Sequence, residues 1–583
     1  MTNQVPGSTS ALASAFAPLR LVDYRRLLAG TFVSALGLFL HAVAASWVML
    51  ELTGSPFMVG LVVASSFLPR LFAGIPAGAL ADIVDRRAIL IWVNVTSALL
   101  ALVLSWLDHG GALTPALLVV LSLGLGLSGA INLPAYQATV PDLVPRALVA
   151  NAVSLQSGTF NVARALGPAI GGLLVGGGHS DLAFALNGIS YLFVSAAALS
   201  LSGAFRAEEP VPVRRAMLTG LRFVRHTGLI RQVVAITSLF ALTSASVQTL
   251  LPNVAQDALG LGAQGYGGLY ACFGAGALLG ALSLERARRL ITERHIIPLA
   301  FAGFGSAGAV FGLVRFPPLN GPLLALLGLF WVWTLATLNA TVQLSAPRWV
   351  RGRAMGIYLL AFTGFYPIGS LAAGAVAEIM GAAPTIALFC APAVFIGLAA
   401  RHVKLPALSE IVEPTLPDDW AGKHDDSARI PGGPVVVVTE WEIDPADSAE
   451  FLAVMRQLRT HRYQTGAFRW GLFRNVEHRH RMTELFEVAD WQEHLRQHER
   501  VTGDHFAVLE RARSFDRAGG PHTRHLVGVD LGHATKPPRW AQLLVVDHTQ
   551  ERERRTWHEE PASNASGSKR KPSLGPSDSK ESE

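Results

Sequence analysis

One segment near residue 80 combines glycine, acidic and basic side chains at the end of a long apolar run. It reads Gly78-Ala79-Leu80-Ala81-Asp82-Ile83-Val84-Asp85-Arg86-Arg87. Gly78, with Gly74 four residues earlier, allows two helices to approach closely. Asp82 can pair with arginines or with the positive end of a helix. We expect electrostatic contacts at this loop; the alternative is a charged turn with no further role.

A second segment, Gly167-Pro168-Ala169-Ile170-Gly171-Gly172, places proline among small residues inside another apolar run. Pro168 removes a backbone hydrogen bond and can kink a helix. The three glycines thin the helix, so that a neighbouring helix can pack closely against it. The pattern predicts either a helix that moves during function or a packing motif alone.

Arg164 lies well inside the same apolar run, three residues before Gly167. An arginine at membrane depth is costly and should face protein or water, with a partner. The sequence leaves two roles open, a structural ion pair or carbonyl contact and the binding of an anionic substrate. Arg70, which follows Pro69 near the middle of an earlier run, raises the same question.

Titratable groups that could carry a proton are scarce in the apolar runs. Glu51, Asp257 and Glu378 stand near run ends, and His41 stands near the middle of the first run. A proton path could use His41 or Asp82, although a single histidine is more often a hydrogen-bonded core residue. Further polar candidates for a substrate or proton path are Asn132, Tyr136, Gln137, Gln156, Asn161, Gln248, Asn339, Gln343, Tyr358 and Tyr366.

The C-terminal part contains histidine pairs that could suggest a metal site. His494 and His498 are four residues apart on an expected helix, and His478 and His480 flank an expected turn. Neither pair has a third ligand nearby in the sequence, whereas zinc sites use three or four protein ligands. We therefore expect no metal, no cofactor and no catalytic residue.

The elements that must position these residues are long apolar helices. The chain of 583 residues is 51% hydrophobic and 15% charged, below the roughly 25% charged residues of soluble domains. Apolar runs of about 18–25 residues match a helix that crosses a bilayer. We predict twelve, near 27–50, 57–80, 88–107, 114–138, 152–176, 182–204, 231–254, 265–284, 296–314, 322–345, 354–379 and 383–401.

Basic residues predict the orientation of these helices. They cluster at the N-terminus and in every second loop, at Arg25 and Arg26, Arg86 and Arg87, and onward through the chain, whereas the alternate loops offer little beyond Arg315. Short cytoplasmic loops retain Lys and Arg. We expect a multi-pass protein of the inner (plasma) membrane with both termini cytoplasmic. This pattern accounts for the net charge of +6 without a nucleic-acid partner.

The sequence divides into five predicted regions. They are a lead-in with six helices (1–204), a basic linker (205–230) with an amphipathic stretch around Met217–Ile230, six further helices (231–404), an α+β module (430–530) and a disordered tail (536–583). In the module, the alternation of Val435–Trp441 predicts a strand, Phe468–Asn475 and Met482–Val488 a strand pair, and His522–Val529 a closing strand.

The two groups of six helices show a faint internal repeat. A shift of 202 residues superimposes Pro145, Arg146, Ala152, Gly167 and Gly172 on Pro347, Arg348, Ala354, Gly369 and Gly374. Both segments are a Pro-Arg loop followed by a glycine-rich helix. Two halves related in this way predict a substrate site between them, near the middle of the membrane.

These motifs resemble those of the major facilitator superfamily. Gly78, Asp82, Arg86 and Arg87 resemble its loop signature, with Asp85 in place of the usual glycine. The Gly-Pro-x-x-Gly-Gly segment resembles the antiporter motif of its drug/proton exporters. Together with Leu52–Pro56 and Pro134–Ala138, they are similar to the transmembrane secretion effector family. The resemblance implies a latch between two halves at Asp82 and its arginines, and efflux of siderophores, drugs or metabolites.

The C-terminal module resembles the dimeric α/β-barrel, ferredoxin-like modules related to antibiotic-biosynthesis monooxygenases. Some of those modules are enzymes, whereas here the resemblance favours a cytoplasmic regulatory unit or a homodimer contact.

The sequence therefore predicts an all-α membrane protein of the major facilitator fold with an α+β module. Its predicted function is export of a small organic molecule, by proton antiport with alternating access. Two other readings remain open at this point, a membrane-anchored monooxygenase-like enzyme and a receptor that transports nothing.

Overall fold

The computed structural model describes residues 16–201, 213–291, 293–400 and 433–528. The predicted tail (536–583) and the first part of the predicted linker lie outside these ranges. The chain divides into two compact units. The first unit comprises Met1–Asp418, Ala453–Thr465 and Arg500–Arg511, and the second comprises Asp419–Leu452, Gly466–Glu499 and Ala512–Glu583.

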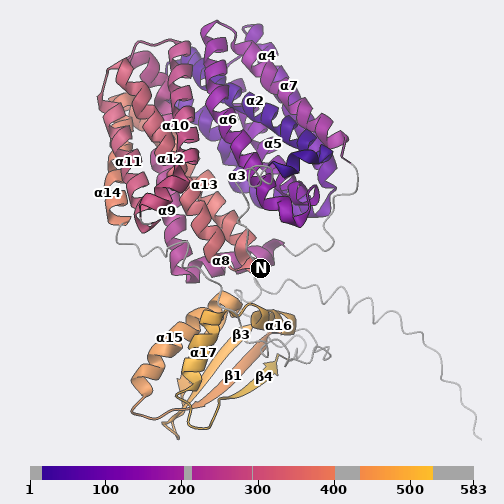
Figure 1. The fold of residues 1–583 in the computed structure, drawn as a ribbon, viewed down its shortest axis with the longest axis vertical. Coiled ribbons are helices and arrows are strands. Elements are labelled where there is room, and N and C mark those ends of the chain that lie inside the picture. Colours follow the sequence, from indigo (N-terminus) through magenta and orange to yellow (C-terminus); the bar gives the residue numbers. More distant parts are fainter. Residues whose placement is uncertain (1–15, 202–212, 292, 401–432, 529–583) are drawn as a thin grey trace, which may run out of the picture. The chain divides into compact units, whose positions relative to one another are not determined.

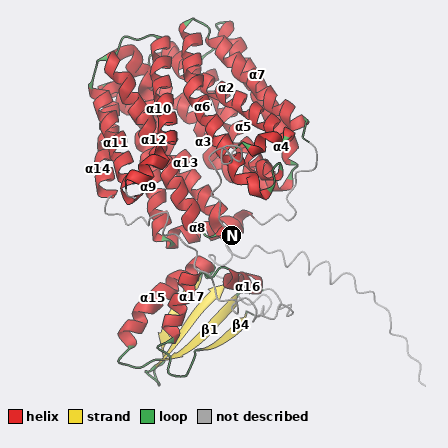
Figure 2. Cartoon of the chain, in the orientation of Figure 1, coloured by secondary structure: helices red, strands yellow, loops and turns green. Residues whose placement is uncertain are grey.

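Twelve long helices of the first unit form two sets of six. Figures 1 and 2 show this helical body. The N-terminal half contains α2 (Val22–Thr53), α3 (Pro56–Ile83), α4 (Arg86–His109), α5 (Pro115–Asp142), α6 (Val149–Gly176) and α7 (Ser180–Leu199). The C-terminal half contains α9 (Gly228–Asn253), α10 (Ala263–Leu290), α11 (Glu293–Leu313), α12 (Pro317–Ser345), α13 (Arg348–Met380) and α14 (Ala382–Ala400).

Within the described residues, eleven helices are long and apolar enough to cross a membrane. The helix of the twelve that does not meet this criterion is α6, because Asn161, Arg164 and its many small residues lower its hydropathy. It packs between α2 and α10 among helices that do meet the criterion. The helical membrane architecture is confirmed, and the twelfth span stays a prediction.

Side-chain caps mark the start of some of these helices. The Ser55 hydroxyl accepts a hydrogen bond from the Met58 N–H at the start of α3. Thr114 does the same for the Leu117 N–H at the start of α5. Such caps satisfy backbone donors that a helix leaves free. Gly54 ends α2 with a φ of 64°, a conformation that favours glycine.

The two halves meet mainly through two pairs of helices, α6 with α10 and α3 with α13. The internal repeat reappears in these contacts. A Cβ at Gly167 would lie 2.6 Å from the Phe39 Cβ on α2, and one at Gly369 would lie 2.6 Å from the Leu242 carbonyl on α9. The glycines at 172 and 374 face α10 and α3 in the same way. Corresponding helices therefore pack equivalently in both halves.

The linker contains helix α8 (Val213–His226), which begins and ends slightly before the predicted amphipathic stretch. Phe223 and Val224 are buried. The Phe223 ring lies 5.8 Å from Trp349 on α13 in an edge-to-face arrangement. At these positions the apolar face of α8 therefore packs on protein.

The C-terminal region contains β1 (Val435–Glu442), α15 (Ser448–Thr465), β2 (Arg469–Arg474), β3 (Arg481–Val488), α16 (Trp491–Glu499), α17 (Gly503–Arg513) and β4 (His522–Val527). The strands form one antiparallel sheet in the order β2-β3-β1-β4. This is the strand order of a ferredoxin-like α+β unit, as predicted. Val435, Val437, Ala467, Phe486 and Val488 form its small apolar core.

Candidate functional site

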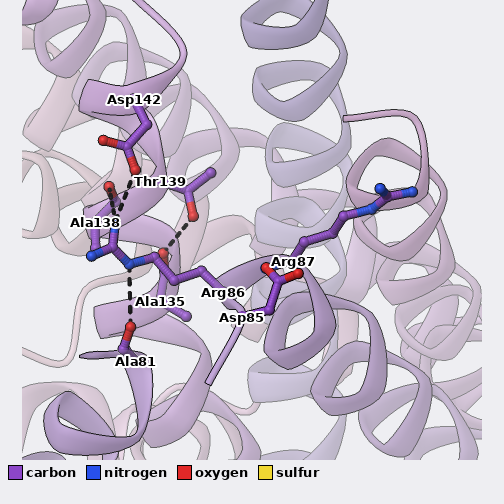
Figure 3. Close-up of polar contacts among 8 residues, drawn as sticks. All are labelled: Ala81, Asp85, Arg86, Arg87, Ala135, Ala138, Thr139 and Asp142. Atoms are coloured by element: carbon purple, nitrogen blue, oxygen red, sulfur yellow. Dashed lines mark hydrogen bonds and ion pairs between the residues drawn. The ribbon is translucent and has the colours of Figure 1, made fainter. Parts of the chain in front are cut away.

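The loop between α3 and α4 holds Arg86 in a set of directed contacts (Figure 3). Its guanidinium donates to the Ala81 carbonyl at 3.2 Å and to the Ala138 carbonyl at 3.3 Å. It also pairs with the Asp142 carboxylate at 2.8 Å. The Arg86 side chain is only 12% exposed, so these contacts replace most of its water. Arg86 thereby ties this loop to the end of α5.

Asp85 and Arg87 act differently from Arg86. The Asp85 carboxylate accepts a hydrogen bond from the Arg87 N–H at 2.9 Å and so caps α4. This cap gives a physical reason for the acidic residue where the family signature has glycine. The Arg87 side chain points away from Arg86 (Figure 3) and donates to the Leu199 carbonyl at the end of α7, at 2.6 Å. The contacts of Arg86 and Arg87 therefore stay within the N-terminal half.

Gly78 and Asp82 lie on α3, but their contacts fall outside the described part of the chain. The corresponding loop after α10 lacks the acid, because Leu284 stands there and is buried. Arg289 pairs there only with Glu285, four residues earlier on the same helix. For the predicted latch, the structure therefore describes the contacts of Arg86 and Arg87.

The Gly-Pro-x-x-Gly-Gly segment makes a very close helix contact between the halves. A Cβ at Gly172 would lie 2.3 Å from the Gly267 Cα on α10, closer than any real Cβ contact. A Cβ at Gly171 would lie 3.3 Å from the Leu40 Cα on α2. Pro168 lies inside α6, one turn before Gly172. The segment thus places α6 against α2 on one side and against α10 on the other.

Arg164 lies one turn before Pro168, where α6, α2, α10 and α13 come together. Its guanidinium carbon lies 5.2 Å from the Phe160 ring centre and 5.9 Å from the Phe39 ring centre. The phenol groups of Tyr270 and Tyr366 are close enough to interact with its charge. Among the described residues, Arg164 has no ion pair and no hydrogen bond. The structural ion pair that the sequence left open is therefore not formed with any of them.

Arg70 is the second arginine at membrane depth. Its guanidinium carbon lies 4.8 Å from the Phe67 ring centre, and a Cβ at Gly129 on α5 would lie 3.5 Å from its Nη2. It too has no carboxylate partner within the described ranges. An arginine at the centre of a membrane helix costs roughly 2.5–3.5 kcal/mol on insertion scales. Two such charges point to a function in which the positive charge is used.

Among the further path candidates, Tyr366 lies within reach of the Arg164 charge, and Gln248 accepts a hydrogen bond from the Tyr270 hydroxyl. His41 and Asn132 make other contacts. His41 is 5% exposed, packs 5.5 Å from the Phe184 ring on α7, and both ring nitrogens lack a partner in the described structure. Asn132 accepts a hydrogen bond from Asn94 on α4 at 2.9 Å, inside the N-terminal half. Gln137 on α5 is exposed, and Asn161 on α6 is partly buried.

Sequence reasoning missed several partners in these sites. Asp142 follows Pro141 at the end of an apolar run, and nothing local links it to Arg86. Tyr270 and Phe39 lie on helices far from Arg164 in the sequence. Phe160 was the one recognisable partner, because residues four apart on a helix are neighbours.

Contacts between the halves also gather where α2 ends and α3 begins. The Glu378 carboxylate on α13 accepts hydrogen bonds from the Ser55 hydroxyl and from the Phe57 N–H, the latter at 3.2 Å. The Trp47 ring on α2 stacks on the Tyr266 ring of α10, with centres 5.9 Å apart. These contacts hold the halves together at this end.

The C-terminal sheet region offers little for catalysis. Its hollow is lined by Ile443, Pro445, Ser448, Arg474, Arg479 and Met482, a lining without carboxylate, histidine or cysteine. The His494 and His498 rings approach at 3.1 Å between their Nε2 atoms, and His525 on β4 lies 4.6 Å from His494 between ring centres. Even so, no group of three ligands in the described residues could hold a metal ion.

Comparison with known proteins decides the family. Residues 13–531 match the family described as transmembrane secretion effector, including the C-terminal sheet. The chain belongs to the transmembrane secretion effector family. This family consists of major facilitator transporters, so the chain is a multi-pass membrane transporter and not an enzyme. The predicted family and fold class are confirmed.

The chain is also similar to curated efflux and transport proteins. The chain is 29% identical to the multidrug efflux pump Tap of Mycolicibacterium fortuitum, over 68% of this chain and 97% of that protein. It is 25% identical to the staphyloferrin A transporter of Staphylococcus aureus, over 61% and 90%. It is 27% identical to the enterobactin exporter EntS of Escherichia coli, over 58% and 80%.

Solved structures show the same fold at low sequence identity. The nucleoside transporter NupG is 14% identical with a TM-score of 0.53, over 65% of this chain and 98% of that chain. A D-xylose-proton symporter is 12% identical with a TM-score of 0.54, over 67% and 99%. These likenesses place the helical body in the major facilitator fold.

Proposed function

We propose that the chain exports small organic molecules across the cell membrane, by proton antiport with alternating access. The multidrug efflux named for Tap and the enterobactin export named for EntS support export. The observation that carries the mechanism is the packing of the halves mainly through two helix pairs, α6 with α10 and α3 with α13. Two packed bodies with one narrow interface can rock around a site between them.

The proposed orientation places both termini in the cytoplasm of a plasma membrane, as the basic loops predict. The end where Glu378 contacts Ser55 and Phe57 then faces outward. Its contacts support an arrangement that is closed toward the outside. Opening to the outside would require this carboxylate to leave the start of α3.

The latch is proposed at Gly78, Asp82, Arg86 and Arg87, on the cytoplasmic side. The Arg86 contacts to the Ala81 carbonyl, the Ala138 carbonyl and Asp142 tie the end of α3, on which Asp82 lies, to α5. The hinge is proposed at Gly167, Pro168, Gly171 and Gly172. Its close contact with Gly267 supports this role, because a helix that slides past another needs small residues.

The coupling ion is proposed to be the proton, with Asp82 or His41 as its carrier. His41 is buried without a hydrogen-bond partner among the described residues, so protonation there would have a large effect. A homodimer contact is proposed on the C-terminal sheet. Residues along its edge strand β4 are mostly exposed, and exposed edge strands pair readily with a second copy. Light scattering of the full-length protein in detergent measures this oligomeric state.

The export proposal is tested first by metabolite analysis. A deletion strain and its complemented strain are compared for small organic molecules in the medium. We expect at least one compound to accumulate inside the deletion strain and to return to the medium on complementation. In inside-out vesicles, that compound should be taken up and should dissipate an imposed pH gradient. The absence of both effects would reject export.

The latch is tested with Asp82→Asn in the same vesicles. At equal membrane abundance, we expect uptake of that compound to fall about tenfold or more, because an amide cannot form the ion pair that one conformation needs. Arg289→Gln, which removes only an exposed pair on α10, is the matched control and should leave uptake unchanged. Unchanged uptake by Asp82→Asn would remove the latch proposal and leave export standing.

A further inference from the structure

Arg164 is a positive charge surrounded by aromatic rings from both halves. Phe39 and Phe160 come from the N-terminal half, and their ring centres lie 5.4 Å apart. Tyr270 and Tyr366 come from the C-terminal half and are 7% and 2% exposed. The Tyr270 hydroxyl donates to the Gln248 side chain on α9 at 3.0 Å, which fixes its direction. The guanidinium therefore lies at the interface around which the halves would move.

No hydrogen bond from this guanidinium is formed with any described residue. A cation over a ring uses the face of the planar group. The five N–H donors point outward in the plane of the guanidinium and match the two oxygens of a carboxylate or the oxygens of a phosphate. No described side chain or carbonyl accepts from them, and part of the Arg164 surface remains accessible. The donors are thus available to a bound molecule.

The rings continue toward a second guanidinium. Tyr366 lies 4.7 Å from Phe67 between ring centres, and Phe67 in turn lies 4.8 Å from the Arg70 guanidinium carbon. Tyr366, whose phenol is within reach of the Arg164 charge, is therefore linked through Phe67 to Arg70. Such a surface favours flat apolar groups through ring contacts and negative groups through the two charges.

We propose that Arg164 and the rings of Phe39, Phe160, Tyr270 and Tyr366 form the binding site for an aromatic organic anion, and that this is the substrate class of the exporter. The substrate's acidic group accepts hydrogen bonds from the Arg164 N–H donors, and its ring packs against the tyrosines. Arg70 offers a second position for negative charge. The assignment to export rests on the proposed function, whereas the binding site does not.

The test uses three probes with the same ring and different charge: 1-naphthoate, 1-naphthamide and 1-naphthylmethylammonium. Their binding to the full-length protein in detergent is measured by calorimetry at pH 7.5. We expect 1-naphthoate to bind at least about tenfold more tightly than the neutral amide, because a charge-assisted hydrogen bond is stronger than a neutral one. The ammonium probe should bind most weakly.

Variants then locate the site. Arg164→Gln should weaken 1-naphthoate roughly 10–100-fold and leave 1-naphthamide unchanged. Arg164→Lys should recover only part of the anion affinity, because lysine keeps the positive charge but cannot form the bidentate hydrogen bonds of a guanidinium. Arg289→Gln, an exposed arginine on α10, is the control that should change nothing. Thermal melting of each variant without probe separates loss of binding from loss of folding.

The proposal is overturned if the amide or the ammonium probe binds as tightly as 1-naphthoate, or if none of the three binds. It is also overturned if a folded Arg164→Gln protein keeps its anion affinity. The binding of 1-naphthoate is measured in detergent without a proton gradient. A failure to detect export or antiport would therefore not change the measured affinity. A failure of anion binding in turn leaves the export proposal standing with a different substrate class.

Discussion

At the scale of single residues, the molecule places two kinds of arginine in different surroundings. Arg86 has a carboxylate and two carbonyls as partners, at the end of the helices. Arg164 has rings as neighbours, in the middle of a helix. A charge that is already paired stabilises structure, whereas a charge without a partner in the described structure is available to a ligand.

The partners of Arg86 predict a stability effect. Arg86→Gln removes a mostly buried, hydrogen-bonded charge, so it should destabilise the protein by roughly 1–3 kcal/mol. Asp142→Asn, at the exposed end of the pair, should cost at most about 1 kcal/mol. Unfolding in mixed micelles measures both, with Arg289→Gln as a control near zero. Equal effects of Arg86→Gln and Arg289→Gln would show that the buried contacts contribute nothing.

At the scale of helices, glycine decides how close α6 can come to its neighbours. The Gly172 and Gly267 backbones meet where any Cβ would overlap. Gly158, on the same helix, has open space around its Cα. The two positions provide a matched comparison on one element.

Gly172→Ala should lower stability by about 1–3 kcal/mol, because the added methyl group forces α6 and α10 apart. It should also slow uptake of the exported compound in vesicles. Gly158→Ala should be neutral or slightly stabilising, since alanine favours helix over glycine. Melting temperatures and uptake rates of the two variants provide the measurement. Indistinguishable variants would mean that the close contact is not needed.

The helices α15 and α17 carry a histidine pair that predicts a pH dependence. The His461 and His505 rings lie 4.3 Å apart. Burial lowers the pKa of His461 to about 4, and burial together with the neighbouring His461 lowers the pKa of His505 to about 3. The unfolded chain binds protons near pH 6.5, so it takes up more protons than the folded chain below that pH.

The free energy of unfolding of this helix pair should therefore be highest above about pH 6.5 and should fall as the pH drops toward 4. The decrease is expected to be up to about 1.4 kcal/mol per pH unit for each histidine. Hydrogen-exchange protection factors of α15 and α17 in the full-length protein, at pH 7.5 and 5.0, measure the loss. His505→Gln should flatten the dependence. Equal protection at the two pH values in the unaltered protein would contradict the prediction.

At the scale of the whole molecule, the two sets of six helices repeat the same contacts. Gly167 and Gly369 face the first helix of their own half, whereas Gly172 and Gly374 face a helix of the other half. Each half therefore contributes one glycine-rich helix to the interface. This arrangement suits alternating access, because the contacts of α6 with α10 and of α3 with α13 can change together when the halves move.

Orientation is the prediction that belongs to this scale. A green fluorescent protein fused after residue 583 should fluoresce, because it stays in the cytoplasm. Alkaline phosphatase at the same position should be inactive, and the enzyme inserted at Gly111, in the turn between α4 and α5, should be active. Activity measured in whole cells provides the comparison. The reverse pattern would invert the proposed orientation. The latch would then face outward, and the contacts of Glu378 would face the cytoplasm.

The sequence by itself determined the membrane helices, the basic loops and the strands of the C-terminal sheet. These features follow from local hydropathy and from periods of two and 3.6 residues, which need no knowledge of distant segments. The predicted strand Val435–Trp441 lies within one residue of β1 for this reason. The loop and helix motifs were also recognisable, because each lies on one continuous segment.

Only the tertiary structure decided which side chains meet. The choice of Asp142 as partner of Arg86, and of Phe39, Tyr270 and Tyr366 as neighbours of Arg164, depends on how helices far apart in the sequence rotate and slide against each other. His41, Asn132 and Gln137 looked equally suited to a path, yet packing placed them away from Arg164. Hydropathy fixes that a helix crosses the membrane, whereas close packing fixes which face it turns to its neighbours.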